Sequence, residues 1–306
     1  MKDEKLLMAE AAVLYYKENR TQQEIAQLMH LSRQTVSKLL NDAIEEKIVE
    51  ITIRDPQRDS QELQDQICRH FGIRSCVVCR VSGREDSLRQ LMTVKAAAEY
   101  IIPILEKGNQ KIAISWGRTV QSLIHTLPPL STTGNTVFPL FGATDNEHAY
   151  FSSNELARSM AGKIGAAVKC AWFPYMAPTP EDHRLLKELS YYKAMEDMWN
   201  TADVAILGIG NTEILEIFGD TFGYRDLHHQ AIGDVATHFF NESGAFIQLY
   251  EGTLCASVEH IKSAKESIAI ACGEEKAQAI AGALRTGMID TLITDEYTAR
   301  QILATL

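Results

Sequence analysis

Three short stretches near the N-terminus carry apolar residues at the three- and four-residue spacing of an amphipathic helix. They contain Leu7, Ala11, Leu14 and Tyr15 in the first, Ile25, Leu28 and Met29 in the second, and Val36, Leu39 and Leu40 in the third. Thr21 precedes the second stretch, with Glu24 three residues later, and Ser32 precedes the third. These side chains are suited to capping helix N-termini. The pattern therefore predicts three short helices packed on one another, with a tight turn near His30.

The pattern changes after the third stretch. Residues 48–53 alternate apolar and polar side chains, as a half-buried β-strand does. Residues 54–58, Arg-Asp-Pro-Gln-Arg, are charged and contain a proline, which is typical of a linker. We therefore place a domain boundary after residue 55, between a winged-helix-like domain over 1–55 and a larger domain over 56–306.

In the larger part, short β-branched runs alternate with helical stretches. The pattern predicts strands near 76–81, 111–115, 136–141, 171–176, 203–209, 267–272 and 291–294, and helices near 60–71, 88–107, 118–127, 153–168, 182–200, 275–286 and 296–304. Such alternation is typical of a Rossmann-like α/β domain whose parallel sheet is covered on both faces. Ligands of these domains bind beyond the carboxyl ends of strands, so we look for function at the strand-to-helix turns.

Composition narrows the class of protein. The 306 residues are 45% hydrophobic and 23% charged, which excludes a collagen, a coiled-coil rod and a disordered chain. No run approaches the roughly 18 apolar residues of a spanning helix, and acidic residues follow Met1, so we expect a cytoplasmic protein with no membrane partner. The six cysteines are too sparse for a disulfide scaffold. The C-x-x-C pair of Cys76 and Cys79 lies inside a predicted strand, which favours buried packing over a zinc site.

The net charge of −10 argues against a nucleic-acid partner when taken for the whole chain. Residues 1–54, however, contain eight Lys/Arg and nine Asp/Glu, so the acidity belongs to the remainder. Residues 22–41 place a small residue, Ala26, where two helices must approach, and apolar residues at helix-turn-helix spacing. His30 replaces the usual glycine of the turn, but histidine tolerates the left-handed conformation better than β-branched residues do.

The predicted third helix presents a polar outer face with two cations and no acid between Ser32 and Asn41. Such side chains can bind phosphates and base edges. The candidate DNA-binding residues are Thr21, Gln22, Ser32, Arg33, Gln34, Thr35, Ser37, Lys38 and Asn41. The alternative is a three-helix unit with a solvated polar face that binds nothing.

A second candidate site is the turn Ser115-Trp116-Gly117-Arg118-Thr119, which follows an apolar strand and starts a helix. Backbone N–H groups at a helix start can hold a phosphate, together with the hydroxyls of Ser115 and Thr119 and the guanidinium of Arg118. The alternative is an ordinary turn in which Gly117 relieves crowding and Thr119 caps the helix.

Together these motifs resemble those of one protein family. The chain resembles the SorC/DeoR-type sugar-binding transcriptional regulators through the helix-turn-helix, the SWGRT turn and five further matches in order: PLFG at 139–142, AILGIG at 205–210, AIGD at 231–234, ACG at 271–273 followed by Lys276, and LITDE at 292–296. The resemblance implies an effector domain with the fold of ribose-phosphate isomerases and glucosamine-phosphate deaminases, a phosphorylated sugar as effector, and assembly as a dimer or tetramer.

The resemblance also implies roles for single residues. Ser115, Gly117, Arg118 and Thr119 would face the phosphate, Asp234 would accept hydrogen bonds from sugar hydroxyls, and Lys276 would reach the phosphate or a sugar oxygen; Gly142 and Asn211 complete the candidate ligand-binding set. Asp after Gly is also a common turn residue, and Asn is equally a turn former. A lysine in the first turn of a helix needs an anionic partner, which a phosphate or Glu274 and Glu275 could supply.

Some family members carry a lysine in the strand-end motif that reads PLFG here, where it can form a Schiff base. Phe141 occupies this position, so we predict noncovalent binding and no cofactor. We expect no metal site, since His228 and His229 fit a solvated loop better. The sequence thus predicts a regulator of a carbohydrate-utilisation operon that binds double-stranded operator DNA under control of a sugar phosphate. The alternative is a sugar-phosphate isomerase or deaminase fused to a DNA-binding domain; we find no paired carboxylates for such chemistry.

Overall fold

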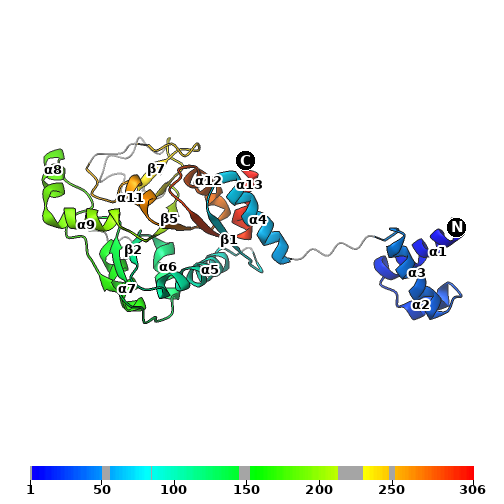
Figure 1. Ribbon diagram of the computed structural model, residues 1–306. Coiled ribbons are helices and arrows are strands. Elements are labelled where there is room, and N and C mark those ends of the chain that lie inside the picture. Colours follow the sequence, from blue (N-terminus) through cyan, green and yellow to red (C-terminus); the bar gives the residue numbers. More distant parts are fainter. Residues whose placement is uncertain (1, 50–55, 84, 145–151, 213–229, 248–251) are drawn as a thin grey trace. The chain divides into compact units, whose positions relative to one another are not determined.

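The computed structural model describes residues 2–49, 56–83, 85–144, 152–212, 230–247 and 252–306 (Figure 1). The chain divides into two compact units, Met1–Pro56 and Gln57–Leu306, and each is described by itself. His228 and His229 lie outside the described residues. Among the helices that the structure describes, none is both long and apolar enough to cross a membrane.

The N-terminal unit is helical, as predicted. It contains α1 (Lys2–Ala12), the π-helix η1 (Val13–Lys17), α2 (Gln22–Leu28) and α3 (Arg33–Glu45). Helices α1 and α2 pack against α3 around the buried side chains of Ala11, Ile25 and Val36. The predicted inner face of the first helix is partly wrong, because Leu7 and Tyr15 are exposed. Tyr15 lies in the π-helix, whose wider turn rotates the residues after Ala12 away from the periodicity that the sequence suggested; Leu7 precedes it, in α1.

Both predicted caps are present. The Thr21 hydroxyl accepts a hydrogen bond from the backbone N–H of Glu24, whose carboxylate accepts one from the N–H of Thr21 in return. The Ser32 hydroxyl accepts from the N–H of Thr35 at 3.0 Å. His30 has φ of 55°, so the turn takes the left-handed conformation that the missing glycine would have adopted.

The predicted strand over 48–53 and the predicted linker fall largely outside the described residues. Ile48 and Val49 pack partly against the small core and form no strand. Helix α4 (Pro56–Phe71) begins within the predicted linker, because proline suits the first turn of a helix, where its missing N–H has no partner to lose.

The larger unit is an α/β domain, as predicted, with its strands at the centre and helices outside them (Figure 1). Seven parallel strands run in the order β1-β9-β8-β5-β2-β3-β4. They are β1 (Ser75–Cys79), β2 (Lys111–Ile114), β3 (Thr136–Pro139), β4 (Ala167–Val168), β5 (Val204–Gly210), β8 (Glu266–Ile270) and β9 (Thr291–Asp295). Strands β6 (Gly233–Val235) and β7 (His238–Phe240) extend β5 as an antiparallel hairpin. The hairpin was not predicted.

The helices of this unit follow the predicted alternation with two differences in extent and one helix, α11, that was not predicted. They are α5 (Asp86–Glu106), α6 (Arg118–Thr126), α7 (Ser153–Ile164), α8 (Pro180–Glu188), α9 (Ser190–Asn200), α11 (Val258–Ser263), the 3-10 turn η4 (Glu274–Lys276), α12 (Ala277–Arg285) and α13 (Glu296–Ala304). The predicted helix over 182–200 is two helices, because Leu189 is extended, with ψ of 142°. The predicted helix over 153–168 ends at Ile164, before left-handed Gly165.

The predicted strand over 171–176 is wrong. This segment forms only single bridges, from Pro174 to Ala143 and from Met176 to Thr253, while the edge strand β4 precedes it. A proline lacks the N–H that a continuous ladder requires. The C-x-x-C segment, by contrast, forms β1 as predicted, with Cys76 buried and all six cysteines free. On α9, Tyr192, Met195 and Trp199 are core residues, and the Trp199 indole donates to the carbonyl of Pro139.

Candidate functional site

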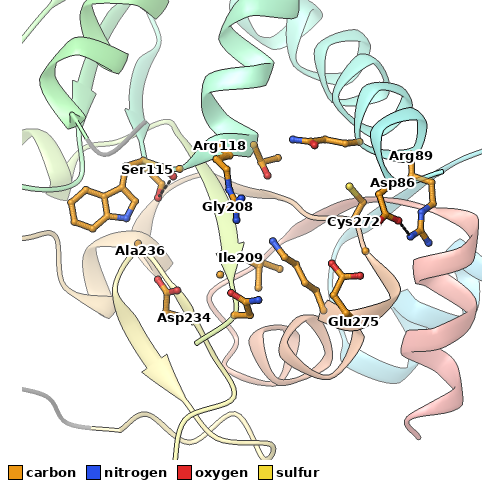
Figure 2. Close-up of a pocket in the computed structure, with 18 residues that line it drawn as sticks. Asp86, Arg89, Ser115, Arg118, Gly208, Ile209, Asp234, Ala236, Cys272 and Glu275 are labelled. Atoms are coloured by element: carbon orange, nitrogen blue, oxygen red, sulfur yellow. Dashed lines mark hydrogen bonds and ion pairs between the residues drawn. The ribbon is translucent and has the colours of Figure 1, made fainter. Parts of the chain in front are cut away.

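A cavity of about 460 Å³ opens where β2, β5 and β8 end (Figure 2). Its wall combines Asp86, Arg89 and Gln90 of α5, Ser115 to Thr119 of the turn before α6, Gly208 to Asn211 at the end of β5, Asp234 and Ala236 of the hairpin, and Cys272, Gly273, Glu275 and Lys276 around η4. Strands β2 and β5 are neighbours in the sheet. From β2 the chain continues to β3 on one flank of this pair, and from β5 it continues to β8 on the other. The cavity therefore lies at the point where the strand order reverses, the usual ligand site of such sheets.

Seven of the eight candidate ligand residues line this cavity: Ser115, Gly117, Arg118, Thr119, Asn211, Asp234 and Lys276. Gly142 does not, and its prediction is corrected. A β carbon on Gly142 would lie 2.3 Å from the backbone oxygen of Pro174, and its own N–H donates to the carbonyl of Leu254. This glycine permits close packing of three backbone segments away from the cavity.

The turn before α6 begins its helix at a glycine in the cavity wall. Gly117 is the N-cap, with φ of 111°, and no side chain caps the helix start. No atom lies within 4 Å of a β carbon built on Gly117, so the backbone conformation and not crowding requires glycine. Both parts of the ordinary-turn alternative therefore disagree with the structure, because Thr119 is not the cap either. Arg118 reaches over the end of β5 toward Gly208 (Figure 2).

Asp234 is the buried carboxylate of the cavity. Its Oδ2 accepts a hydrogen bond from the backbone N–H of Thr237 at 3.0 Å. Burial raises the pKa of Asp234 to about 6, against the smaller lowering effects of that hydrogen bond and of Lys276. The hairpin turn between β6 and β7 consists of Ala236 and Thr237, both with positive φ, a conformation that costs free energy in non-glycine residues.

The residues around η4 show which charged groups lie near Lys276. Glu274 does not fill this role, since its Oε1 accepts a hydrogen bond from the guanidinium of Arg89 at 2.8 Å. The charge of Lys276 acts instead on Asp234 and Cys272 in the cavity wall. Lys276 ends a 3-10 turn and is the N-cap residue of α12, so its cation lies at the positive end of that helix dipole, where an anion beside it would be stabilising.

Several cavity residues were missed by the sequence interpretation. Asp86 and Arg89 come from the first turn of α5, and Arg89 is only 5% exposed. An acid and an arginine three residues apart are common on helices, so this pattern carries no distinct signal. Trp116 is also buried, and it stacks on Phe141 with ring centroids 4.3 Å apart. Phe141 is fully buried behind it and does not line the cavity.

The polar face predicted for the third helix is present. Arg33, Gln34, Thr35, Lys38 and Asn41 are exposed along α3, and Ser37 and, on α2, Gln22 are half-buried. The hydroxyls of Thr21 and Ser32 serve as caps, and the two hydroxyl oxygens of Ser32 and Thr35 lie 2.7 Å apart. A helix with capped start and a solvent-facing row of amides and cations is the form in which helix-turn-helix proteins contact DNA.

Comparisons with known proteins agree with both units. The Sugar-bind family model, which describes a sugar-binding domain, matches residues 55–304, and the model of sigma-70 region 4 matches residues 10–46. A helix-turn-helix joined to an α/β domain with a polar cavity at its switch point defines an effector-controlled transcription regulator. The chain belongs to the SorC/DeoR-type family of sugar-binding transcriptional regulators.

Relatives match along nearly the whole chain. The chain is 29% identical to the sorbitol operon regulator of Klebsiella pneumoniae, with 98% of both chains covered. It is 25% identical to the deoxyribonucleoside regulator of Bacillus subtilis, again with 98% of both covered. The crystal structure of the full-length sorbitol operon regulator SorC from Klebsiella pneumoniae has a TM-score of 0.75 and 29% identity, covering 97% of this chain and 98% of that one.

Proposed function

We propose that this protein regulates transcription of a carbohydrate-utilisation operon, and that noncovalent binding of a phosphorylated sugar in the cavity controls its affinity for operator DNA. The observation that carries the proposal is the convergence of Ser115, Arg118, Thr119, Asp234 and Lys276 on one cavity from three separate segments of the chain. Donors and cations gather at the start of α6, and a carboxylate suited to hydroxyl groups lies in the hairpin.

The test of the phosphate site is a thermal-shift screen against sugar phosphates and the matching free sugars. Binding to the folded protein raises Tm by mass action. We expect a shift with a phosphorylated sugar that is absent with its free form and lost in Arg118→Ala. Arg184→Ala is the matched control, since Arg184 is an exposed arginine of α8 that pairs only locally with Glu181 among the described residues. An equal shift with the free sugar would contradict a phosphate site.

The test of DNA binding needs no knowledge of the operator. The logarithm of the DNA-binding constant falls linearly with the logarithm of the salt concentration. Removing one phosphate contact makes this slope shallower by about one. We expect this change for Lys38→Ala on a generic duplex measured by fluorescence anisotropy. Lys17→Ala is the control, because Lys17 is an exposed lysine of η1 outside the predicted contact face. Identical slopes for wild type and Lys38→Ala would contradict the predicted contact.

Support for noncovalent binding without catalysis comes from the cavity wall. Phe141 stands where some relatives would place a reactive amine, and it is buried behind Trp116. Cys272 lines the cavity, but burial raises the pKa of its thiol, which keeps it neutral and weakly nucleophilic. Borohydride treatment with an aldehyde sugar phosphate should leave the protein mass unchanged. A reduced adduct would overturn noncovalent binding, and product release from millimolar sugar phosphate would favour an isomerase or deaminase.

Helix-turn-helix proteins commonly bind as dimers to half-sites about one helical turn apart. We therefore propose a dimer or tetramer that reads a symmetric operator in the cytoplasm. The effector controls affinity only if it binds one arrangement of this assembly better than another. Light scattering of the purified protein, with and without the effector, measures the assembly; a monomer under both conditions would contradict it.

A further inference from the structure

Three charged side chains form a wall of the cavity that the proposed phosphate site does not use. They are Asp86 and Arg89 of α5 and Glu275 of η4. Figure 2 shows them on one side of Gly208 and Ile209, with Ser115 and Asp234 on the other side. A sugar phosphate whose phosphate lies at the turn before α6 would place the rest of the sugar toward this wall. Its charges therefore bear on which sugar phosphates fit.

The one cation of this wall is already neutralised. The Arg89 side chain is 6% exposed, and its guanidinium pairs with Asp86 and with Glu274 Oε1 at 2.8 Å. Its Nε has no hydrogen-bond partner among the described residues, so the buried charge depends on these two carboxylates and on the charge of the buried Asp295. Removing these carboxylates is costly, because the buried guanidinium would be left uncompensated. Arg89 is therefore held in place and is not available to a ligand.

The remaining charge of the wall is negative. Asp86, together with Glu274, which pairs with Arg89 but does not line the cavity, outnumbers Arg89 by one. Glu275 adds a carboxylate with no hydrogen bond or ion pair to any described residue. Lys276, the next residue, supplies one cation, which the proposed function assigns to the phosphate. A second phosphate or a carboxylate at this wall would meet like charges, whereas a hydroxyl or an ammonium group would meet acceptors.

We propose that the effector is a sugar monophosphate whose end away from the phosphate carries hydroxyl or amino groups, and that Asp86 and Glu274, by holding Arg89, make the cavity reject a second anionic group there. This inference rests on the proposed function. It assigns Asp86, Arg89 and Glu274 to specificity between ligands that share the same phosphate.

The experiment is calorimetric titration of the full chain with matched probes. Glucose 6-phosphate is compared with glucosamine 6-phosphate, 6-phosphogluconate and glucose 1,6-bisphosphate, and fructose 6-phosphate with fructose 1,6-bisphosphate. In each set we expect every compound with a second phosphate or a carboxylate to bind about tenfold or more weakly than the corresponding monophosphate. We expect glucosamine 6-phosphate to bind at least as tightly as glucose 6-phosphate. Asp86→Asn and Glu274→Gln should each reduce the discrimination severalfold. Glu181→Gln, on exposed α8, should leave it unchanged.

The outcomes separate the two proposals. A bisphosphate that binds as tightly as its monophosphate, or discrimination that persists in both variants, would overturn the inference and leave the phosphate sensor standing. If no probe and no other sugar phosphate binds, the proposed function fails and the inference fails with it. The melting temperature of each variant without ligand shows whether it folds, and the ratio of Kd values within one variant does not depend on its stability.

Discussion

Gly210 and Asp234 face each other across the antiparallel pair of β5 and β6, and a β carbon on Gly210 would lie 2.1 Å from Oδ1 of Asp234. The carboxylate therefore occupies the space that any other residue at position 210 would fill. Its second oxygen is held by the N–H of Thr237. The glycine of one strand and the turn of the next thus fix the position of the Asp234 carboxylate, which we propose binds a sugar hydroxyl.

Gly210→Ala should weaken binding of the effector at least tenfold, because the methyl group must displace the Asp234 carboxylate. Calorimetric titration measures the change. Gly208→Ala, on the same strand, has its nearest neighbour at 3.8 Å and serves as the control for stability, since its methyl group meets only ordinary contacts. Unchanged affinity in Gly210→Ala would show that the carboxylate does not contact the sugar.

Asp234→Asn should stabilise the protein without ligand, and more so at pH 7.5 than at pH 5. Burial raises the pKa of Asp234 from 3.8 to about 6, so between these two pH values the folded state holds a proton that the unfolded state has lost. This contribution to stability is complete below pH 3.8 and is lost as pH rises through 6. The cost of ionisation at neutral pH is roughly 3 kcal/mol.

Urea unfolding of wild type and Asp234→Asn at both pH values checks this sign. The same variant should bind the effector more weakly, since an amide accepts fewer hydroxyl donors than a carboxylate does. A loss of stability at pH 7.5 would contradict the prediction, because it would mean that the ionised carboxylate is better satisfied in the folded protein than its burial indicates.

Gly142→Ala should lower the free energy of unfolding by about 2 kcal/mol or more, because its methyl group would overlap the backbone of Pro174 and Tyr175. Gly162→Ala is the matched control on α7. Gly162 is exposed and no atom lies within 4 Å of its added carbon, so the change should stabilise α7 by about 0.5–1 kcal/mol. Thermal unfolding monitored by circular dichroism distinguishes the two. Equal effects would contradict the packing role of Gly142.

His30→Val should destabilise the N-terminal unit by about 1–2 kcal/mol, because a β-branched residue is strained at the left-handed φ of 55°. Amide hydrogen exchange of α2 and α3 measures this opening free energy. His30→Gly is the control and should retain wild-type protection or exceed it, since glycine adopts this conformation freely. If the valine variant exchanges as slowly as wild type, the turn does not hold the conformation described.

The features that the sequence predicted well are those with a local cause. The caps at Thr21 and Ser32 require only a hydroxyl and the first turn of a helix, and the turn at Ser115 to Thr119 follows an apolar strand directly. The roles of Asp234 and Lys276, by contrast, were predicted only through the family resemblance, and Asp234 lies on an antiparallel hairpin that the pattern of strands and helices did not indicate.

The features that the sequence did not predict depend on neighbours distant in the chain. The hairpin of β6 and β7 has Ala236 and Thr237 in its turn, without the glycine or asparagine that signals such turns. Helix α8 ends at Glu188, although its C-cap, Leu189, is neither glycine nor proline. Arg89 acquires its role only when α5 and η4 meet, 185 residues apart in sequence. Gly142 ends a strand-end motif that resembles a ligand site in the family, but here it permits close packing against the backbone of Pro174 and Tyr175.

The reversal of strand order at β2 and β5 has a consequence for how the domain opens. A sugar phosphate across the ends of these strands would contact segments whose continuations form opposite halves of the sheet. Opening either half would release the ligand, so binding would join the two into one cooperative unit. Amide protons of β3 and of β9 should then exchange more slowly to the same degree, although neither strand touches the cavity.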